Sequence, residues 1–272
     1  MKASLNFFGL ATALVMAAAA AAMSAALAEP IKAASQVATP ACGAPSELTS
    51  LQLRLPRMAR RAAAGQPLTI VAIGSSSTYG AGASSQEQSY PSHLAAELKA
   101  LFPRLPITVL NRGVNGEESR DMLARFDRDV FAEKPDLVLW QVGSNSVLRD
   151  RPLKGADAPL HVGLRRLHEA GVDVVLINPQ YSPKVITKHD VDGMVALIDL
   201  IAKEANVDLF PRFAIMRHWQ LAQHLPFSTF ISPDGLHMND WGYGCWAKLL
   251  AGSLHEAATR ATSTATAMPT PR

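Results

Sequence analysis

The stretch LTIVAIGSSSTYGAG, residues 68–82, introduces a pattern that recurs along the chain. A short apolar run, residues 68–73, ends at Gly74 and is followed at once by three serines. An apolar run of this length that is bounded by a glycine indicates a strand buried on both faces of a sheet. The serines after it are compatible with a flexible turn, a phosphate-binding loop or the site of a nucleophilic serine.

Four further apolar runs share the length and composition of the first, and they are ITVLN from Ile107, LVLWQV from Leu137, VVLIN from Val174 and VDLF from Val207. Stretches with apolar residues at helical spacing separate them, at residues 90–102, 120–133, 160–170 and 190–205. Buried strands that alternate with helices are typical of a parallel sheet with right-handed crossovers. The sequence therefore predicts the α/β class, with a five-stranded parallel sheet in a three-layer α/β/α sandwich. In this architecture, ligands bind beyond the carboxyl ends of the strands.

The amino terminus has the pattern of an export signal. Residues 1–28 combine Lys2, an Ala-rich apolar run and the small-residue motif Ala26-Leu27-Ala28, which predicts a signal peptide cleaved after Ala28. Cleavage would leave 272 − 28 = 244 residues, enough for one α/β domain, in the periplasm or outside the cell. The alternative is an uncleaved membrane anchor, because the apolar run is nearly long enough to span a bilayer. After cleavage, no stable membrane insertion is expected.

The mature chain is predicted to have three parts. Residues 29–66 form a lead-in that is extended at first and helical over residues 47–64. Residues 67–258 form the domain that contains the sheet, and this domain ends in a helix from residue 242 to about residue 258. Residues 259–272, rich in Ala, Thr and Pro, form a disordered tail.

Charge and cysteine content exclude several classes of function. The net charge is +3, and the basic cluster RLPRMARR at residues 54–61 has no interleaved aromatic residues. We interpret this cluster as the solvated face of a short helix, and we expect no nucleic acid as a partner. The two cysteines, Cys42 and Cys245, belong to no metal-binding pattern of Cys and His. In an oxidising compartment they can form a disulfide or remain free, and the sequence leaves both possibilities open.

The segment that follows the first strand, residues 74–80 (the serine turn), fits no cofactor-binding motif. It lacks the Lys of the phosphate loop G-x-x-x-x-G-K-[ST], and no G-x-G-x-x-G follows a predicted strand. Thr78 stands where the nucleophile elbow G-x-S-x-G has its second glycine. We therefore expect no organic cofactor, and the lack of a metal-binding pattern of Cys or His leads us to expect no metal ion. A flexible turn and the site of a nucleophilic serine are the two interpretations that remain at this point.

Residues suited to acyl transfer follow the predicted strands. The serine turn follows the first strand, Gly116 lies in the loop after the second, and Asn145 follows the third. The segment SPDGLHMN before the last helix contains Asp234 and His237. Because they stand three residues apart in one turn, the Asp234 carboxylate can reach the imidazole Nδ1–H while Nε2 faces a serine. Together these groups can supply a nucleophile, a base, an orienting acid and donors for an oxyanion.

These segments resemble the motifs of the SGNH/GDSL hydrolase family, whose members have a flavodoxin-like sheet. The family motif Gly-Asp-Ser-x-x-x-Gly is matched by residues 74–80, with Ser75 in place of the Asp. The G-x-N and D-x-x-H motifs are matched by residues 143–145 and 234–237. The resemblance extends over roughly residues 68–250, and its weight lies in the order of the motifs along the chain, since each motif alone is short.

The resemblance implies a role for each matched residue. Ser76 would be the nucleophile, His237 the base and Asp234 the acid that orients it. The implied oxyanion hole consists of Ser76, Gly116 and Asn145, with Gly113 as the alternative to Gly116.

The function implied by the resemblance is that of an exported serine hydrolase. It would cleave carboxylic esters through an acyl-enzyme, and its substrate would be a small-molecule ester or an acylated carbohydrate, with short acyl groups on carbohydrates favoured. One alternative is a cell-envelope O-acyltransferase that uses the same triad. Another is a non-catalytic carbohydrate-binding protein on the same scaffold. The sequence leaves open the acyl-chain length, the alcohol moiety and the oligomeric state.

Overall fold

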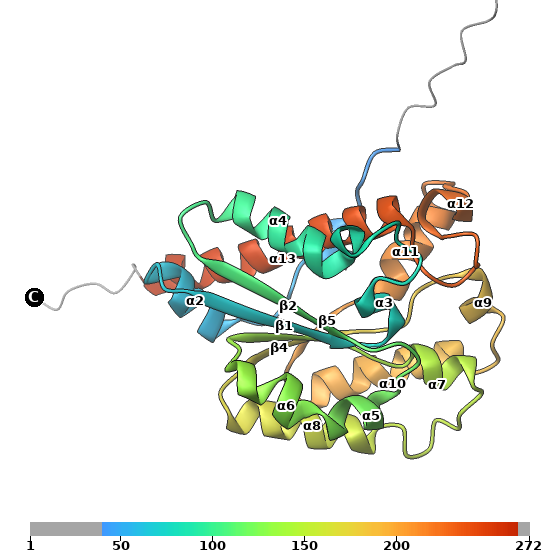
Figure 1. Cartoon of the computed structure of the whole chain (residues 1–272), viewed down its shortest axis with the longest axis horizontal. Coiled ribbons are helices and arrows are strands. Elements are labelled where there is room, and N and C mark those ends of the chain that lie inside the picture. Colours follow the sequence, from blue (N-terminus) through green and yellow to red (C-terminus); the bar gives the residue numbers. More distant parts are fainter. Residues whose placement is uncertain (1–39, 266–272) are drawn as a thin grey trace, which may run out of the picture. The chain divides into compact units, whose positions relative to one another are not determined.

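In the computed structural model, which describes residues 40–265 and the side chains of residues 40–260, a parallel sheet lies between two layers of helices (Figure 1). The strands are β1 (Leu68–Gly74), β2 (Ile107–Gly113), β3 (Leu137–Gln141), β4 (Asp173–Ile177) and β5 (Asp208–Phe210). Their order in the sheet is β2-β1-β3-β4-β5, and every neighbouring pair is parallel. This is the flavodoxin-like order, in which the chain changes direction across the sheet between β1 and β3. The predicted fold class is confirmed.

Both faces of the sheet are buried, as the continuous apolar runs predict. Successive side chains of a strand point to opposite faces. In β1, Leu68, Ile70 and Ala72 belong to one hydrophobic core, whereas Val71 and Ile73 belong to the other. All five side chains are buried. One apolar strand therefore contributes to two cores at once.

Helices cover each face of the sheet (Figure 1). One core contains residues of α2 (Pro56–Ala63), α4 (Tyr90–Leu101), α11 (Arg212–Leu221) and α13 (Asp240–Ala265). The other core contains residues of α5 (Ser119–Ala124), α6 (Phe126–Asp129), α8 (Ala158–Glu169) and α10 (Val191–Glu204). The connections also contain short helices, which are α1 (Ser46–Thr49), α3 (Ser76–Tyr79), η1 (Gln86–Gln88), η2 (Phe131–Glu133), α7 (Ser144–Leu148), α9 (Pro183–Ile186) and α12 (Phe227–Phe230). None of the helices within residues 40–265 has the length and apolar character needed to span a membrane.

The helix expected over residues 47–64 is wrong in its extent, because the structure has two short helices, α1 and α2, there instead. The break lies before Pro56, whose ring disfavours a helical conformation in the residue that precedes it. Leu55 accordingly has φ −106° and ψ 78°. Leu51 and Leu55 are both buried, so the segment between the helices packs on the core without being helical.

The expected helix at residues 120–133 is likewise divided, into α5, α6 and η2. The first break lies at Arg125, which is buried. Its guanidinium donates to the backbone carbonyls of Gly74 and Arg112 near the ends of β1 and β2, and it pairs with Glu117 and Asp129. These contacts between distant parts of the chain replace the continuation of one helix.

The carboxy-terminal helix is longer than expected. α13 starts at Asp240 and continues to Ala265, so residues 259–265, which were predicted to belong to a disordered tail, are helical. Ala257 and Ala258 are buried in the core, and Arg260 donates to the carbonyl of Leu51 at 2.8 Å. The Ala- and Thr-rich composition of residues 259–265 gives no indication of these tertiary contacts. The predicted signal peptide, residues 1–28, and the end of the predicted tail, residues 266–272, lie outside the described residues.

The basic cluster of residues 54–61 also differs from its interpretation as a purely solvated face. Arg57 and Arg61 of α2 both contact Asp136, which immediately precedes β3 and has a side chain only 3% exposed. The Asp136 carboxylate also accepts the backbone N–H of Thr69 in β1. Part of the cluster therefore fixes α2 to the amino-terminal edge of the sheet.

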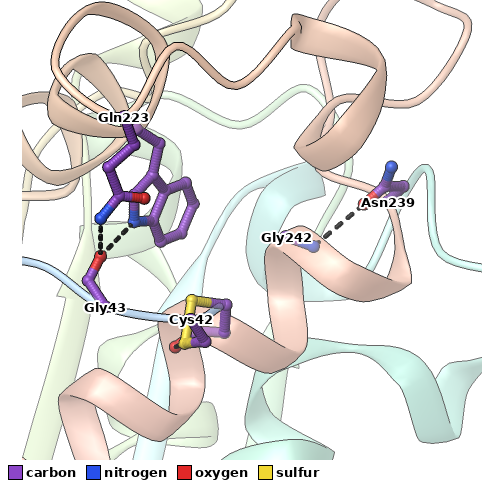
Figure 2. Close-up of a disulfide and its surroundings, with 7 residues drawn as sticks. Cys42, Gly43, Gln223, Asn239 and Gly242 are labelled. Atoms are coloured by element: carbon purple, nitrogen blue, oxygen red, sulfur yellow. Dashed lines mark hydrogen bonds between the residues drawn. A yellow bond between two sulfur atoms is a disulfide. The ribbon is translucent and has the colours of Figure 1, made fainter. Parts of the chain in front are cut away.

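A disulfide joins two cysteines that lie 203 residues apart in the chain, Cys42 and Cys245 in α13 (Figure 2). Their Cα atoms are 5.4 Å apart, within the range that a disulfide requires. The adjacent carbonyl of Gly43 accepts hydrogen bonds from Trp219 Nε1 at 2.9 Å and Gln223 Nε2 at 3.1 Å (Figure 2). The disulfide that the sequence left open is thus present. Together with the hydrogen bonds of Gly43, it holds residues 42–43 against α11 and α13.

Loss of this disulfide should lower the free energy of unfolding by about 2–4 kcal/mol, because the cross-link restricts the unfolded chain. The measurement is urea unfolding of the wild type with and without dithiothreitol, beside the double variant Cys42→Ser/Cys245→Ser. The oxidised wild type should be more stable than both other samples, and the double variant should not respond to the reductant. A wild-type midpoint that does not change on reduction would contradict the prediction.

Candidate active site

The nucleophile candidate Ser76 lies directly after β1, at the carboxyl end of the sheet. β1 ends at Gly74, and Ser76 is the first residue of the short helix α3. The turn is closed by hydrogen bonds from the amides of Thr78 and Tyr79 to the carbonyl of Ser75. As a first-turn residue, Ser76 has a backbone N–H without a partner inside the helix. This N–H is available to a ligand near the Ser76 hydroxyl.

Buried hydrogen bonds to Gln141, the last residue of β3, hold the turn that carries Ser76. Gln141 Oε1 accepts the backbone N–H of Ser75 at 3.0 Å, the Ser75 hydroxyl at 2.9 Å and the Thr78 hydroxyl at 3.4 Å. All three residues are buried. Ser75, which stands where the family motif has Asp, therefore points into the protein and takes part in fixing the turn. Sequence reasoning missed Gln141, although an amide at the end of an apolar strand was a visible indication.

The structure brings Ser76, His237 and Asp234 together. His237 Nε2 lies 2.8 Å from Ser76 Oγ, and His237 Nδ1 lies 2.5 Å from Asp234 Oδ2. The first distance joins residues that are 161 positions apart in the sequence, and the second joins residues that are three positions apart. An imidazole placed between a hydroxyl and a carboxylate can take a proton from the hydroxyl while the carboxylate stabilises the cation that forms. The catalytic roles themselves stay predictions.

The turn that carries Asp234 and His237 is itself held by hydrogen bonds. Asp234 Oδ1 accepts the backbone amides of Leu236 at 2.8 Å and His237 at 2.9 Å, and the Ser232 hydroxyl at 2.7 Å. This turn also packs against Gly82, the last residue of the opening stretch. A Cβ added at Gly82 would lie 2.7 Å from His237 Cβ, so a side chain there would displace the histidine.

These contacts determine the charge of Asp234. Burial alone would raise the pKa of its carboxyl, but the hydrogen bonds from the His237 imidazole, from the amides of His237 and Leu236 and from Ser232 outweigh burial. They hold the pKa of Asp234 well below its usual range. The carboxylate is therefore ionised at neutral pH, as an orienting acid must be.

The two remaining oxyanion candidates, Gly116 and Asn145, follow β2 and β3, the strands on either side of β1. Gly116 follows β2 and has φ +79°, a conformation that favours glycine. Asn145 is in α7, after β3, and its Nδ2 donates to the carbonyl of Glu117 at 2.8 Å. Because a carboxamide has two N–H groups, one remains for an oxyanion. The alternative glycine, Gly113, uses its N–H in a 2.9 Å bond to the side chain of Asn111, which favours Gly116.

α7 holds the Gly116 loop through further contacts. Arg149 donates to the Gly116 carbonyl at 2.7 Å and to the Glu118 carboxylate at 2.6 Å. The Ser146 hydroxyl donates to the same carboxylate at 3.3 Å. Together with Asn145, these contacts connect α7 and Arg149, the residue directly after it, to three successive positions of the loop, residues 116–118. Sequence reasoning missed Arg149, because nothing local relates it to the loop.

A buried polar network connects the serine turn with the Asp234–His237 turn. From Gln141 it runs through the Ser144 hydroxyl to Gln180 Oε1, and Gln180 Nε2 donates to the carbonyl of Leu236 at 3.4 Å. Arg212, 1% exposed, donates to Gln180 Oε1 at 2.9 Å. Burial lowers the pKa of Arg212 to about 10, so its guanidinium still carries a charge at neutral pH. Sequence reasoning missed this network because its members come from four separate segments.

The described part of the chain has no set of side chains suited to hold a metal ion. Residues 40–260 contain no group of three or more His, Cys, Asp and Glu side chains that could hold a metal ion. What the site contains is a hydroxyl, an imidazole, a carboxylate and N–H donors, and these groups suit acyl transfer.

Two known esterases are similar in sequence to parts of this chain. An acetylxylan esterase of Geobacillus stearothermophilus is 41% identical over 64 residues, which make up 24% of this chain and 29% of that protein. An arylesterase of Vibrio mimicus is 27% identical over 151 residues, 56% of this chain and 70% of that protein. The match to the acetylxylan esterase thus covers less than a third of that protein's length.

Solved structures share the fold. A two-domain esterase active on acetylated mannans superposes with a TM-score of 0.65 and 24% identity, covering 76% of this chain and 53% of that one. Axe2, an acetylxylan esterase of Geobacillus stearothermophilus, has a TM-score of 0.57 and 22% identity, covering 69% of this chain and 94% of that one. The chain therefore spans about half the length of the two-domain esterase, and these likenesses show the fold.

The family model described as non-GDSL lipase-like matches residues 41–260. The match contains the whole sheet, the serine turn and the Asp234–His237 turn. It also agrees with the departure at Ser75, where the motif Gly-Asp-Ser lacks its Asp. This chain belongs to the non-GDSL lipase-like family.

Proposed function

We propose that this chain is an exported serine hydrolase of SGNH type that cleaves carboxylic esters. The observation that carries the proposal is the line of hydrogen bonds from Ser76 Oγ through His237 to Asp234, at 2.8 Å and 2.5 Å. Nucleophile and base are within hydrogen-bond reach, and the base is oriented by a third group, as acyl transfer requires.

In the first half of the reaction, Ser76 Oγ attacks the ester carbonyl carbon and its proton passes to His237 Nε2. Asp234 accepts the Nδ1–H and stabilises the imidazolium that forms. When the tetrahedral intermediate collapses, the bond to the alcohol oxygen breaks and His237 returns the proton to the leaving alcohol. The acyl group is then an ester of Ser76.

In the second half, water takes the place of the alcohol. His237 removes a proton from water, which attacks the acyl carbonyl carbon. When the second intermediate collapses, the bond from the acyl carbon to Ser76 Oγ breaks, His237 returns the proton to Ser76 Oγ, and the carboxylic acid leaves. In both halves the negative charge on the carbonyl oxygen is held by the N–H groups of Ser76 and Gly116 and by the side-chain amide of Asn145. The hydrogen bonds of Gln141 and Arg149 keep these donors in place before the substrate arrives.

Short acyl groups on carbohydrates are the substrates that we favour. The relatives and structural neighbours are named for acetylxylan, aryl esters and acetylated mannans, and acetylated carbohydrates recur among them. Those names apply to the other proteins, and they support the same class of substrate here. Transfer of the acyl group to a sugar hydroxyl instead of water would use the same residues.

Export is supported by two independent features. Residues 1–28 have the pattern of a cleaved signal peptide. The Cys42–Cys245 disulfide is of a kind that persists in the periplasm or outside the cell and is rare in a reducing cytosol.

Ser76→Ala should abolish hydrolysis of 4-nitrophenyl acetate and labelling by a fluorophosphonate probe, with the circular dichroism spectrum unchanged. Ser85→Ala, a nearby change outside the site, is the control and should retain both. Activity retained by Ser76→Ala would exclude the mechanism. A wild type that is never labelled would favour the non-catalytic carbohydrate-binding protein, and acylated sugar formed from an added acceptor would favour the acyltransferase.

Asn145→Ala should lower kcat by about 10² to 10³, because one oxyanion donor is lost. KM should change much less, since the donor acts on the charge that develops in the transition state. Ser146→Ala, which removes a different contact between α7 and the Gly116 loop, should cost less than about tenfold. Similar losses in both variants would mean that Asn145 only positions the loop.

Asp234→Asn should lower kcat by about 10⁴, because an amide does not hold the imidazole in the required tautomer.

The effect of Asp234→Asn on the stability of the fold should depend on pH. A carboxyl whose pKa is lowered by folding stabilises the fold above its unfolded pKa of about 4, and this stabilisation is lost as the pH falls through the lower folded pKa. Urea unfolding should therefore show a larger difference between wild type and variant at about pH 7 than at about pH 3. Equal differences would contradict the lowered pKa.

A further inference from the structure

A groove of about 470 Å³ has Gly116 in its lining, and none of residues 74–80 lines it. Its walls come from α5, from α7 and from the connection between α7 and α8, and they include Gly116, Glu118, Arg120, Arg149, Arg151 and Lys154. The volume lies in the range of small-molecule sites. Because Gly116 belongs to both, a substrate held at the predicted oxyanion hole has this groove directly beside it.

The connection that forms one wall of the groove is anchored to the fold. Leu153 packs on the hydrophobic core, where it contacts Gly193 in α10. At the start of the connection, Asp150 pairs with Lys188 at 2.7 Å. The basic side chains on either side of Leu153, Arg151 and Lys154, therefore project from a backbone whose position is set by packing.

Positive charge exceeds negative charge in the groove. Its lining contains four cations, Arg120, Arg149, Arg151 and Lys154, and two carboxylates, Glu118 and Asp121, so the balance is 4 − 2 = +2. The mature chain as a whole has a predicted net charge of 25 − 23 = +2 after removal of Lys2 with the signal peptide. An excess equal to that of the whole mature chain is thus gathered beside the candidate site.

The internal ion pairs do not neutralise this excess. Glu118 is engaged by Arg149 at 2.6 Å and by Arg151 at 3.4 Å, and Asp121 accepts the backbone N–H of Glu118 at 2.9 Å. Within residues 40–260, Arg120 and Lys154 form no ion pair, and both are exposed. Arg151, with 59% of its side chain exposed, has one ion pair among the described side chains, the 3.4 Å contact to Glu118. The groove thus offers guanidinium and ammonium donors to a ligand.

We propose that this groove binds a carboxylate-bearing sugar unit, so that the preferred substrate is an ester on an acidic, uronate-containing carbohydrate. The proposal rests on the proposed function for the reaction and adds the class of carbohydrate. Guanidinium groups match the geometry of a carboxylate, and an ammonium adds a point charge. A positive groove also raises the local concentration of an anionic substrate, an effect that salt screens.

Binding is tested without turnover in the Ser76→Ala background, by calorimetric titration with trigalacturonate and with neutral xylotriose. Adding Arg151→Gln and Lys154→Gln should weaken trigalacturonate binding by about tenfold at low salt, since two charges of the groove are removed. Lys99→Gln/Arg104→Gln, the same loss of charge at exposed positions away from the groove, should leave it within about twofold. Xylotriose binding should respond to neither pair.

Turnover is tested in protein that retains Ser76. The substrates are acetylated oligogalacturonate, acetylated xylooligosaccharide and 4-nitrophenyl acetate. Arg151→Gln/Lys154→Gln should raise KM about tenfold for the acidic substrate only, and added NaCl should reduce the wild type's preference for it. The inference is wrong if acidic and neutral substrates respond equally, or if trigalacturonate binds the two double variants alike. If no ester is cleaved and Ser76 is not labelled, the proposed function fails, while the titration still decides the groove.

Discussion

Helices cover both faces of the five-stranded sheet, so polar side chains of the strands find hydrogen-bond partners mainly where the strands end. The two edges of the sheet use this constraint differently. At the amino-terminal edge, the carboxylates of Asp136, Asp173 and Asp208 accept hydrogen bonds from the backbone and from α2 and the segment before it. At the carboxyl edge, Gln141 and its neighbours carry the loops of the candidate site. One edge contains contacts that stabilise the fold, and the other carries the candidate site.

Gln141, at the carboxyl end of β3, connects the buried interior with the turns that carry the candidate catalytic residues. Its side-chain oxygen satisfies the buried donors of the serine turn, and its amide continues through Ser144 to Gln180 and the Leu236 carbonyl. A buried network of this kind is rigid only when each member is paired. The positions of Ser76 and His237 are therefore set relative to each other through the protein interior as well as through their own hydrogen bond. Ser75 suits this role because its short hydroxyl reaches Gln141.

The elements that were predicted well are those with a strong local pattern. β1 is apolar over its whole length because it faces two cores, and the helices α4, α8 and α10 lie close to their expected bounds. The failures have a common cause in contacts between distant residues. Arg125 interrupts a helical pattern to reach the carbonyls of Gly74 and Arg112, and Arg260 extends α13 by bonding to Leu51. No window of neighbouring residues contains such information.

The sequence by itself determined the α/β class, the segments that carry Ser76, Asp234 and His237, and their order along the chain. It could do so because apolar periodicity and short motifs are local properties of a chain. Only the tertiary structure decided that Cys42 pairs with Cys245, that Gln141 and Arg212 underlie the site, and that Arg120 and Lys154 face a groove beside Gly116. Each of these joins segments that are far apart in the sequence, and their distances exist only once the sheet has brought the strand ends to one edge.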